Sequence, residues 1–430
     1  MSDYETFLAA KTARVGTIGP RIDRGAVHGV LHEWQARTVQ WAVAKGRAAI
    51  FWDCGLGKTF AQLEWARLVG ERALIMAPLS VARQTVREAR KIDVDVRYVR
   101  HQDEANGPGL YITNYETMGA FDPATWDAVV FDESSIVKHH DSRTRITLCR
   151  DWAVVPYRLA CTATPAPNDI AELTNHAELL GIMPRAEMLA AYFVHDDTGW
   201  RIKGHAVEPM WRWISTWATS ARSPADLGHP DEGYALSPLR ILEERVDHVI
   251  DADGQLFATD LGGVGGRAAV RRQTLDARVD RAAKLASGTD DQWIVWCGLN
   301  DESAAIARMV PDAVELTGSD TPEHKAATIE AFQDGQVRVL VTKASIAGFG
   351  VNLQNCAHMA FLGLGDSYET YYQAIRRCYR FGQTRPVDAH IVVSGIESQI
   401  VANVRRKEAQ DRDRISHLVS YSRAELDAFA

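Results

Sequence analysis

The chain has few cysteines, and they lack the spacing of the disulfide-bonded pairs or zinc ligands found in small extracellular and zinc-binding domains. Its six cysteines are scattered along 430 residues, and none forms a Cys-x-x-Cys pair. This spacing suits neither a zinc site nor a disulfide framework. It favours reduced thiols and a cytoplasmic protein.

Long apolar runs are also missing. The first residues, MSDYETFLAAKTARVG, have no apolar core, and no later run approaches 18 apolar residues. We therefore expect no signal peptide, no membrane span and no membrane partner. An excess of positive charge is absent as well. The net charge of −8 argues against a protein that coats nucleic acid by bulk attraction, although it leaves room for a local basic groove.

What the sequence does contain is a regular alternation of short apolar runs with helical patterns. In the first half these runs are Ala48–Trp52, Ala73–Met76, Leu110–Thr113, Ala128–Phe131 and Tyr157–Ala160. In the second half they are Trp293–Cys297, Ala313–Leu316, Val337–Val341, His358–Leu362 and Ala389–Val393. Strands that alternate with helices predict parallel sheets covered on both faces, with binding loops at the carboxyl ends of the strands.

The middle of the chain breaks this rhythm. It carries Trp200, Trp211, Trp213 and Trp217, which either stack on nucleic-acid bases or form a small core; the pattern WRWISTW favours the core. A basic stretch follows, and its arginines either track phosphates or lie on a solvated helix: Arg267, Arg271, Arg272, Arg278 and Arg281. We predict an α/β protein with an N-terminal extension (1–30), a first domain (31–180), a short, mostly helical insertion (181–285) and a second domain (286–430).

The most informative segment is FWDCGLGKTF, which has the pattern of a strand, a loop and a helix. The core of its loop is Gly55, Leu56, Gly57, Lys58 and Thr59. Glycines let backbone N–H groups close around phosphate oxygens, and the helix N-terminus favours negative charge. Lys58 would neutralise the β- and γ-phosphates, and the Thr59 hydroxyl would ligate Mg²⁺. Trp52 stands where the general pattern has its first glycine.

Two further strand ends carry polar groups. The run Val129–Phe131 ends in Asp132 and Glu133, which fit the acid that holds Mg²⁺ and the group that positions an attacking water. A solvated carboxylate pair is the alternative, and the phosphate loop upstream argues against it. Thr162 and Thr164 follow another strand, where their hydroxyls can hydrogen-bond the carboxylates, although Thr-Pro is also an ordinary strand terminator.

A second strong signal lies near the end of the chain, in QAIRRCYRFGQ. Gln373, Arg377 and Arg380 fall at i, i+4 and i+7, which predicts one helical face with an amide and two guanidinium groups. Guanidinium forks suit the charge that develops on a transferred phosphoryl group. A basic surface helix is the alternative. Gln383 and the upstream loop Thr342–Asn352 count against it.

In this order, the motifs resemble those of superfamily-2 helicases and translocases, most closely the Swi/Snf-like branch and its short phage-type relatives. DCGLGKT resembles that branch's DEMGLGKT loop, in which the first glycine is likewise absent. QAIRRCYRFGQ is similar to its QAIDRAHRIGQ motif. The resemblance covers roughly residues 31–180 and 290–395, and it implies two RecA-like parallel-sheet domains in tandem.

The resemblance also implies roles for single residues. Gln35 would read adenine, and Gly350 and Asn352 belong to the interdomain motif beside the nucleotide. Thr162 and Thr164 would couple the two activities. The residues implied to contact nucleic acid are Pro78, Thr113, Asn114, Thr317, Gly318 and Thr342. Ser134 and Ser135 replace the second half of the usual DEAH or DEAD tetrad, which leaves its contact with the coupling loop open.

The function implied is an ATP- and Mg²⁺-dependent DNA helicase or double-strand translocase that hydrolyses ATP between its two domains. Glu133, helped by Gln373, would position the water, and Arg377 and Arg380 would clamp the γ-phosphate. We expect sequence-independent binding to single- or double-stranded DNA. A replication or recombination partner and a bacterial or phage-infected cytosol fit the resemblance.

Two alternatives stay open. One is an RNA helicase or an annealing or branch-migrating motor, against which the Gly-Gln ending and the missing DEAD tetrad count. The other is a nucleotide-gated binding module that recruits a nuclease or replication protein.

Overall fold

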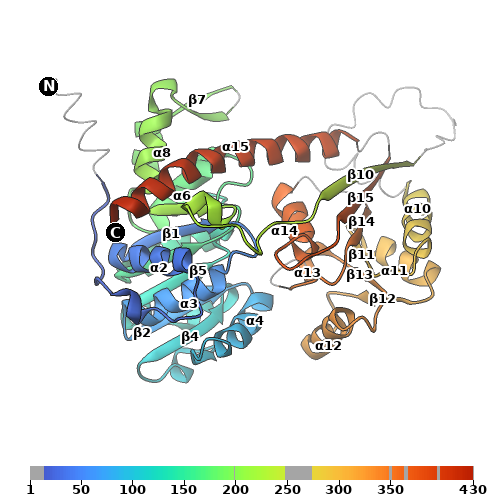
Figure 1. Cartoon of the computed structure of the whole chain (residues 1–430), viewed down its shortest axis with the longest axis horizontal. Coiled ribbons are helices and arrows are strands. Elements are labelled where there is room, and N and C mark those ends of the chain that lie inside the picture. The colour runs from blue at the N-terminus through green and yellow to red at the C-terminus, as the bar shows by residue number, and fades with distance from the viewer. Residues whose placement is uncertain are drawn as a thin grey trace. The chain divides into compact units, whose positions relative to one another are not determined.

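A computed structural model describes residues 14–197, 199–246, 274–347, 351–362, 367–394 and 398–429. The chain divides into two compact units, Met1–Tyr234 with Ala409–Ala430 and Ala235–Glu408. Each unit is built around a parallel β-sheet with helices on both faces (Figure 1). The two RecA-like α/β domains predicted from the sequence are therefore confirmed.

In the described residues of the first unit, seven parallel strands are ordered β3-β4-β2-β5-β6-β1-β9. They are β1 (Arg47–Trp52), β2 (Arg72–Ala77), β3 (Val96–Tyr98), β4 (Gly109–Asn114), β5 (Ala128–Asp132), β6 (Tyr157–Cys161) and β9 (Ala218–Ala221). The central strands are mostly apolar because helices cover both of their faces. An antiparallel pair, β7 (Phe193–Asp196) and β8 (Gly199–Ile202), lies outside this sheet.

The α-helices of the first unit are α2 (Glu33–Lys45), α3 (Lys58–Val69), α4 (Leu79–Arg90), α5 (Arg143–Asp151), α6 (Leu173–Leu179), α7 (Arg185–Tyr192) and α8 (Val207–Ser215). Short 3-10 turns are η1 (Arg24–Ala26), η2 (Gln102–Glu104), η3 (Tyr115–Ala120), η4 (Pro123–Thr125), η5 (Ser134–Val137), η6 (Trp152–Val154), η7 (Ile170–Glu172), η8 (Gly204–Ala206) and η9 (Pro224–Leu227). Alternate strand residues point to opposite faces of the sheet. On one face Val129 and Phe131 cluster with Leu148 of α5 and Leu179 of α6, while α3 and α4 contact the strands from the other side.

In the described residues of the second unit, six parallel strands are ordered β10-β15-β14-β11-β13-β12. They are β10 (Leu239–Val246), β11 (Trp293–Cys297), β12 (Ala313–Leu316), β13 (Val339–Thr342), β14 (His358–Leu362) and β15 (Val387–Ser394). The helices are α10 (Leu275–Ser287), α11 (Asn300–Met309), α12 (Pro322–Gln333), α13 (Ala344–Ala347), α14 (Tyr368–Cys378) and α15 (Ser398–Phe429). Two core clusters show that α10 and α11 cover one face, and α12 and α14 cover the other.

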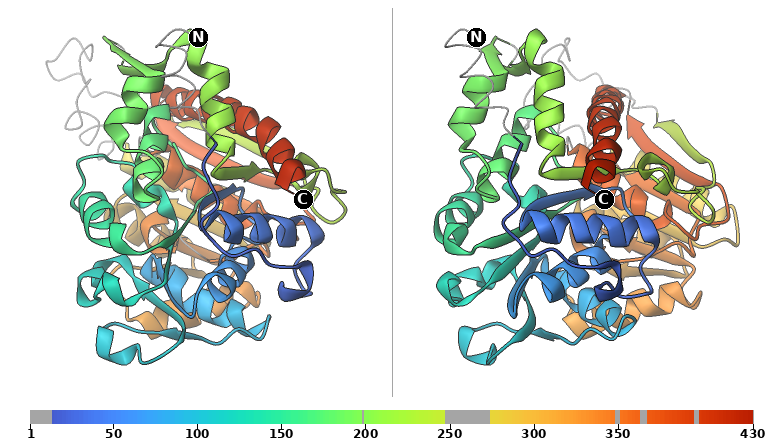
Figure 2. Two further views of the ribbon diagram at one scale, coloured as in Figure 1. Left: turned by 90° about the vertical axis from the view of Figure 1, so that its left-hand side faces the viewer. Right: turned by 60° about the vertical axis from the view of Figure 1, so that its left-hand side comes forward.

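The structure divides the chain at other points than the sequence pattern does. Within the segment predicted as an insertion, β9 pairs with β1 of the first sheet and β10 pairs with β15 of the second. The end of α15 belongs to the first unit, where Glu425 meets the buried Lys45 at 3.3 Å and Ser422 accepts from the Ser220 backbone N–H at 2.9 Å. Figure 2 shows this end of α15 beside α2. Edge pairings of this kind depend on partners far away in the sequence.

The tryptophan-rich segment is a core, as its pattern favours. Trp211 and Trp213 on α8 are 3% exposed and Trp217 is fully buried. They pack in one cluster with α6, α7 and Leu418 of α15. Base stacking is therefore wrong for these three rings, and Trp200 lies half-buried against the same cluster.

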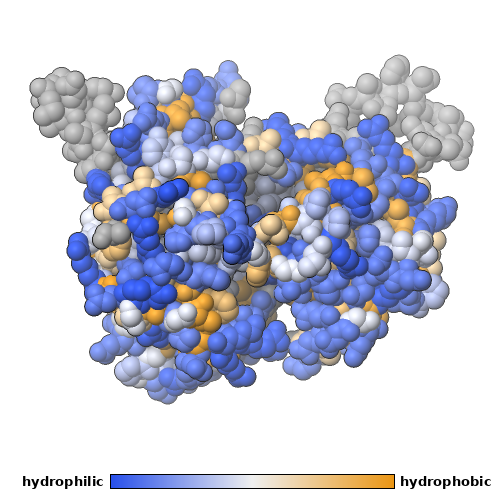
Figure 3. Space-filling model, in the orientation of Figure 1, coloured by the Kyte–Doolittle hydropathy of each residue, from blue (hydrophilic) through white to orange (hydrophobic). Residues whose placement is uncertain are grey.

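The surface shows no sign of an extended apolar face in the view drawn. The side in Figure 3 is mostly hydrophilic, with apolar residues in small groups. Among the described residues, the exposed large apolar side chains are separated along the sequence: Ile18, Val30, Leu79, Ile146, Val154, Leu242, Met309 and Phe381. Within the same part of the chain, no helix combines the length and the apolar character that a membrane crossing requires.

The basic stretch before the second domain does not behave as predicted at Arg278. Its guanidinium is fully buried and donates to Glu302 Oε1 at 2.6 Å, so it neither tracks phosphates nor lies on a solvated face. Glu302 Oε2 accepts from the backbone N–H groups of Gly298 and Leu299, which fixes the start of α11. Arg267, Arg271 and Arg272, for which the same alternatives were predicted, lie outside the described residues.

Replacing Arg278 with alanine is expected to lower the free energy of unfolding by about 3–5 kcal/mol, because it leaves the buried Glu302 carboxylate without its partner. Arg281 on the same helix is the matched control. Its ion pair with Glu244 is at the surface, where the Arg281 side chain is 44% exposed, and its loss is expected to cost less than about 1 kcal/mol. Urea unfolding of the two variants measures the difference. Equal effects would contradict the structural role of the buried pair.

Candidate functional site

The carboxyl ends of β1, β5 and β6 meet at one edge of the first sheet, since these strands are parallel and adjacent. The glycine-rich loop follows β1, the carboxylates follow β5, and the threonine loop follows β6. The phosphate loop, the carboxylates and the coupling threonines predicted from the sequence therefore lie on neighbouring loops.

The loop after β1 has the backbone conformation that its glycines permit. Gly55 and Gly57 have φ values of 88° and 79°, in the left-handed region that other residues rarely adopt. Gly57 is also the N-cap of α3, and no side chain caps this helix end. The first N–H groups of α3 thus lack a side-chain acceptor, an arrangement that favours a bound anion.

Lys58 lies over this loop. Its Nζ donates to the carbonyl oxygens of Trp52 at 2.7 Å and Asp53 at 3.1 Å. The Trp52 ring itself is buried and contacts Trp34, with ring centroids 4.8 Å apart. The tryptophan that replaces the expected glycine is therefore a core residue whose carbonyl holds the lysine.

Gln35 ties α2 to the phosphate loop. Its side-chain Oε1 accepts from the His32 backbone N–H at 2.9 Å, and its Nε2 donates to the Leu56 carbonyl at 2.9 Å. A Cβ atom at Gly57 would lie only 2.5 Å from that Nε2. Gln35 is buried, and its amide sits directly against the loop.

Asp132, at the end of β5, is a buried carboxyl. Its Oδ2 accepts from Gln62 Nε2 at 3.0 Å, and its Oδ1 accepts from the Glu133 backbone N–H at 3.1 Å. Burial raises the pKa of Asp132, and the hydrogen bond from Gln62 and the positive charge of Lys58 oppose that rise. The charged form of Asp132 therefore gains from any additional cation placed beside it.

Glu133 has an unusual backbone. Its φ is 51°, and it is one of two non-glycine residues with positive φ in the part of the chain that the structure describes. Such a conformation costs roughly 1–2 kcal/mol and persists only where the surroundings impose it.

Sequence reasoning missed Gln62 and Tyr115. Gln62 follows Lys58 by four residues, so it lies on the same face of α3, and that spacing is the signal that points to it. Tyr115 donates to the Asp132 carbonyl oxygen at 2.7 Å. Burial is the main reason why the pKa of its hydroxyl is well above the usual value.

The coupling loop is fully buried. Thr162 donates its backbone N–H to the Ile50 carbonyl of β1 at 3.2 Å, and its hydroxyl accepts from the Thr164 N–H at 3.1 Å. The hydroxyl of Ser134 hydrogen-bonds elsewhere, to His176 Nε2 at 3.1 Å. The hydrogen bond of the Ser134 hydroxyl therefore goes to α6 and not to the coupling loop, the contact that the sequence left open.

The nucleic-acid loops predicted in the first unit are mostly occupied by their own contacts. Thr113 is fully buried and its hydroxyl lies 2.7 Å from that of Thr117. Asn114 accepts from the Tyr98 hydroxyl at 3.0 Å and donates to Glu116 at 2.7 Å. In this conformation both side chains are buried. Pro78, half-buried at the start of α4, is the most accessible of the three predicted residues.

The corresponding loops of the second unit lie at the carboxyl ends of β12 and β13, which pair directly. Thr342 is fully buried and donates to the Leu316 carbonyl at 3.0 Å. The Thr317 N–H donates to Asp320 at 2.6 Å. Gly318 is exposed, and its carbonyl accepts from Lys325 Nζ at 2.7 Å.

The arginine motif differs from its predicted geometry. The helix α14 ends at Cys378, and Tyr379 leaves it with φ −85° and ψ 81°, so Arg380 lies in the following turn rather than on the helical face. Gln373 and Arg377 do share a face; both are buried, and Arg377 Nη2 donates to Gln373 Oε1 at 2.6 Å.

Gln383 secures the turn that carries Arg380. Its Nε2 donates to the carbonyls of Gln354 and Cys356, each at 2.9 Å. Nearby, Asn352 Oδ1 accepts from the Gln354 N–H at 3.2 Å. The arginine turn is thus joined to the loop that ends the interdomain motif. Gly350, which is predicted to border the nucleotide, lies outside the described residues.

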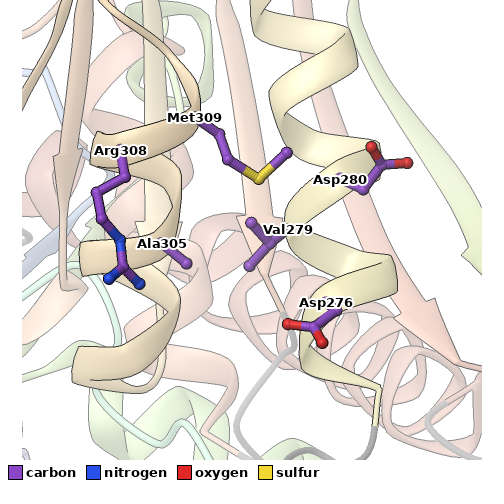
Figure 4. Close-up of a pocket in the computed structure, with 6 residues that line it drawn as sticks. All are labelled: Asp276, Val279, Asp280, Ala305, Arg308 and Met309. Carbon is purple, nitrogen blue, oxygen red and sulfur yellow. The ribbon is translucent and has the colours of Figure 1, made fainter.

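A hollow of about 370 Å³ opens elsewhere in the second unit, between α10 and α11. Val279 and Met309 face each other across it, with Asp276 and Asp280 on one helix and Arg308 on the other (Figure 4). It contains none of the predicted site residues.

Comparison with known proteins places a domain in the second unit. Residues 277–382 match the family described as the helicase conserved C-terminal domain. This span contains Thr317 and Thr342, together with Gln373, Arg377 and Arg380 of the arginine motif. A solved structure, the Sulfolobus solfataricus SWI2/SNF2 ATPase core in complex with dsDNA, is similar with a TM-score of 0.44 and 17% sequence identity, covering 94% of this chain and 96% of that chain.

Three curated relatives match over part of their length. ATP-dependent helicase rhp16 of Schizosaccharomyces pombe is 30% identical over 102 residues, which are 23% of this chain and 12% of that protein. ATP-dependent RNA helicase RhlB of Pseudomonas syringae pv. tomato is 34% identical over 102 residues, 22% of this chain and 25% of that protein. The bifunctional helicase and thymine dioxygenase JBP2 of Trypanosoma brucei brucei is 29% identical over 108 residues, 25% and 10% respectively.

The chain therefore spans no more than a quarter of the length of these curated relatives. The second unit of the chain therefore contains a match to the helicase conserved C-terminal domain, and the phosphate-loop motifs lie in the first unit.

Proposed function

We propose that the chain is a nucleic-acid-stimulated motor that hydrolyses ATP, either a DNA helicase or a double-strand DNA translocase. One observation carries the proposal: the glycine loop, the uncapped start of α3, Lys58 and the buried Asp132 lie at one edge of a single sheet. A site of that composition suits the phosphates and the cation of a nucleoside triphosphate.

The residues present fit ATP and Mg²⁺. Gly55, Gly57 and the first N–H groups of α3 would surround the phosphates, and Lys58 would leave its carbonyl partners for them. Thr59 and Asp132 would hold Mg²⁺, which supplies charge neutralisation between the phosphates. No group of three or more His, Cys, Asp or Glu side chains capable of holding a metal occurs in the described ranges. A magnesium ion held by Thr59 and Asp132 would take its remaining ligands from phosphate oxygens and water.

The remaining catalytic roles follow from the same assignment. Glu133 would orient the attacking water. Arg377 and Arg380 would stabilise charge on the γ-phosphate of a nucleotide held by the first unit, with Gln373 fixing Arg377 through its 2.6 Å hydrogen bond. Gln35 would read adenine from its place beside the loop, and Gly350 and Asn352 would border the nucleotide.

For nucleic acid we propose contacts to the sugar-phosphate backbone, which carry little sequence information. Because Thr113, Asn114 and Thr342 are buried, their loops would bind nucleic acid through backbone groups and exposed neighbours. Pro78, Thr317 and Gly318 would lie closest to the nucleic-acid strand. Arg83 and Arg90 are exposed on α4, directly after Pro78, and would add positive charge there. Buried Thr162 and Thr164 would transmit the state of the carboxylates.

RNA is the second candidate substrate, because one relative is by name an RNA helicase and matches at 34% identity. The sequence favours DNA through the Gly-Gln ending and the absence of a DEAD tetrad. A nucleotide-gated module that recruits a replication or recombination protein is the third candidate, and it predicts slow turnover.

The test is the rate of ATP hydrolysis without polymer and with single-stranded DNA, duplex DNA, forked DNA or RNA, followed by strand displacement on the best activator. We expect the largest stimulation with DNA. Duplex stimulation without displacement identifies a translocase, and displacement identifies a helicase. Stronger stimulation by RNA would overturn the DNA assignment. Hydrolysis that no polymer stimulates would favour the gated module.

A further inference from the structure

Directly after Asp132 and Glu133 the chain enters a buried turn, η5, which a distant helix holds in place. The first residue of η5, Ser134, is fully buried, and its hydroxyl lies 3.1 Å from His176 Nε2 on α6, 42 positions further along the chain. Both side chains are completely shielded from water. A hydrogen bond between two such groups is costly to leave unmade.

The neighbouring residue of α6 holds the other end of the same turn. Asn175 Nδ2 donates to the carbonyl oxygens of Val137 at 3.0 Å and Lys138 at 2.8 Å. Asn175 Oδ1 accepts in turn from Arg185 Nε at 3.2 Å. Two consecutive side chains of α6 therefore fix both ends of η5.

The imidazole of His176 also contacts the strand that leads into the phosphate loop. Its ring meets Phe51 of β1 edge-on, with centroids 5.1 Å apart and an interplanar angle of 80°. Burial lowers the pKa of His176 to about 4, so the ring is neutral near pH 7. A neutral imidazole offers one donor and one acceptor, which suits a hydroxyl partner.

The contacts of α6 with η5 bear most directly on the backbone conformation of Glu133. Its positive φ is a conformation that the surrounding structure must impose, and the residues that follow it are the ones held by α6. We propose that His176, through Ser134, is a positioning residue that keeps the Glu133 carboxylate in place for hydrolysis. The proposal rests on the role of Glu133 in the proposed function.

The test is a double-mutant cycle on ATP hydrolysis at saturating nucleic acid, with Ser134→Ala, His176→Phe and the double variant. His176→Phe keeps an aromatic ring against Phe51 and removes the hydrogen bond. Each single change is expected to lower kcat about tenfold and to change KM for ATP by less than about twofold. The reason is that His176 and Ser134 position Glu133, which acts on the reacting water rather than on nucleotide binding. The double variant is expected to be no slower than either single variant.

Three further measurements separate positioning from general destabilisation. His176→Gln places an amide near the position of Nε2 and is expected to recover most of kcat. Ser215→Ala, a buried serine whose hydroxyl contacts the Arg212 carbonyl within α8, is the matched control and is expected to leave kcat unchanged. Thermal unfolding and nucleotide binding of every variant show whether the first unit stays folded.

Losses that multiply in the double variant, or a loss confined to KM, would overturn the role of His176. So would single variants as fast as the wild-type protein. Failure of the wild-type protein to hydrolyse ATP with any polymer would instead overturn the proposed function itself, so the two failures are distinguishable.

Discussion

Replacing Lys58 with alanine is expected to reduce the rate of ATP hydrolysis on the order of 100-fold or more. The physical reason is local. Lys58 carries a positive charge at the loop, where its Nζ donates to the carbonyls of Trp52 and Asp53. In the proposed function it would leave these carbonyls for the phosphate oxygens. Steady-state hydrolysis with saturating DNA measures the effect.

The control for Lys58 is a lysine with the same charge and no role at the loop. Lys284 on α10 pairs with Asp280 at the surface, where its side chain is 68% exposed. Its replacement by alanine is expected to leave hydrolysis unchanged. Lys58→Arg tests geometry, because a guanidinium keeps the charge but is larger and planar, and little recovery is expected. A Lys58→Ala protein that hydrolyses ATP at the normal rate would contradict the assignment of the whole site.

Replacing Arg380 with alanine is expected to lower kcat about 1,000-fold, the scale on which an arginine stabilises phosphoryl-transfer charge. KM for ATP is expected to change little, because the contact forms mainly in the transition state. Arg380 is half-buried in a turn that Gln383 holds by its own hydrogen bonds, so its loss is expected to leave the fold intact. Steady-state hydrolysis over a range of ATP concentrations gives kcat and KM, and single-turnover hydrolysis isolates the chemical step.

Arg377 is expected to behave differently from Arg380. Arg377 is 6% exposed and hydrogen-bonded to Gln373. Its replacement by alanine leaves the buried Gln373 amide without this hydrogen bond, and it is therefore expected to destabilise the second unit as well as to slow hydrolysis. Arg308, which is exposed on α11, is the control, and its replacement by alanine is expected to change neither stability nor hydrolysis. If Arg380→Ala hydrolysed ATP normally while Arg377→Ala did not, the transition-state role would belong to Arg377 alone.

The arginine motif shows which residues helical periodicity places correctly and which it does not. The spacing of Gln373 and Arg377 places both on one face of α14, as the sequence predicts. Extending the same period to Arg380 is wrong, because a 3.6-residue pattern contains no information about where the helix ends. The end at Cys378 is followed by a turn at Gly382, whose φ is 88°, and Gln383 bonds that turn to the loop of Gln354.

The carboxylate end of β5 shows a second limit. Asp132 was predictable from its place after an apolar strand, but its partner Gln62 and the partner of Ser134, His176, were not identified. Gln62 carried a usable signal, since it lies one helical turn after Lys58. His176 carried none, because its contact with Ser134 spans 42 residues and depends on how α6 packs on the sheet.

The sequence by itself determined two parallel-sheet domains and the strand ends on which the motifs lie, because apolar alternation and glycine loops are local features. It also favoured a core, rather than base stacking, for the tryptophans of α8. Only the tertiary structure decided where the domains divide, since β9, β10 and the end of α15 are assigned by pairing and packing with distant residues. It likewise decided that Arg278 is a buried ion-pair partner and that Thr113, Asn114 and Thr342 are enclosed. Burial is a property of what surrounds a residue, and short-range patterns do not record it.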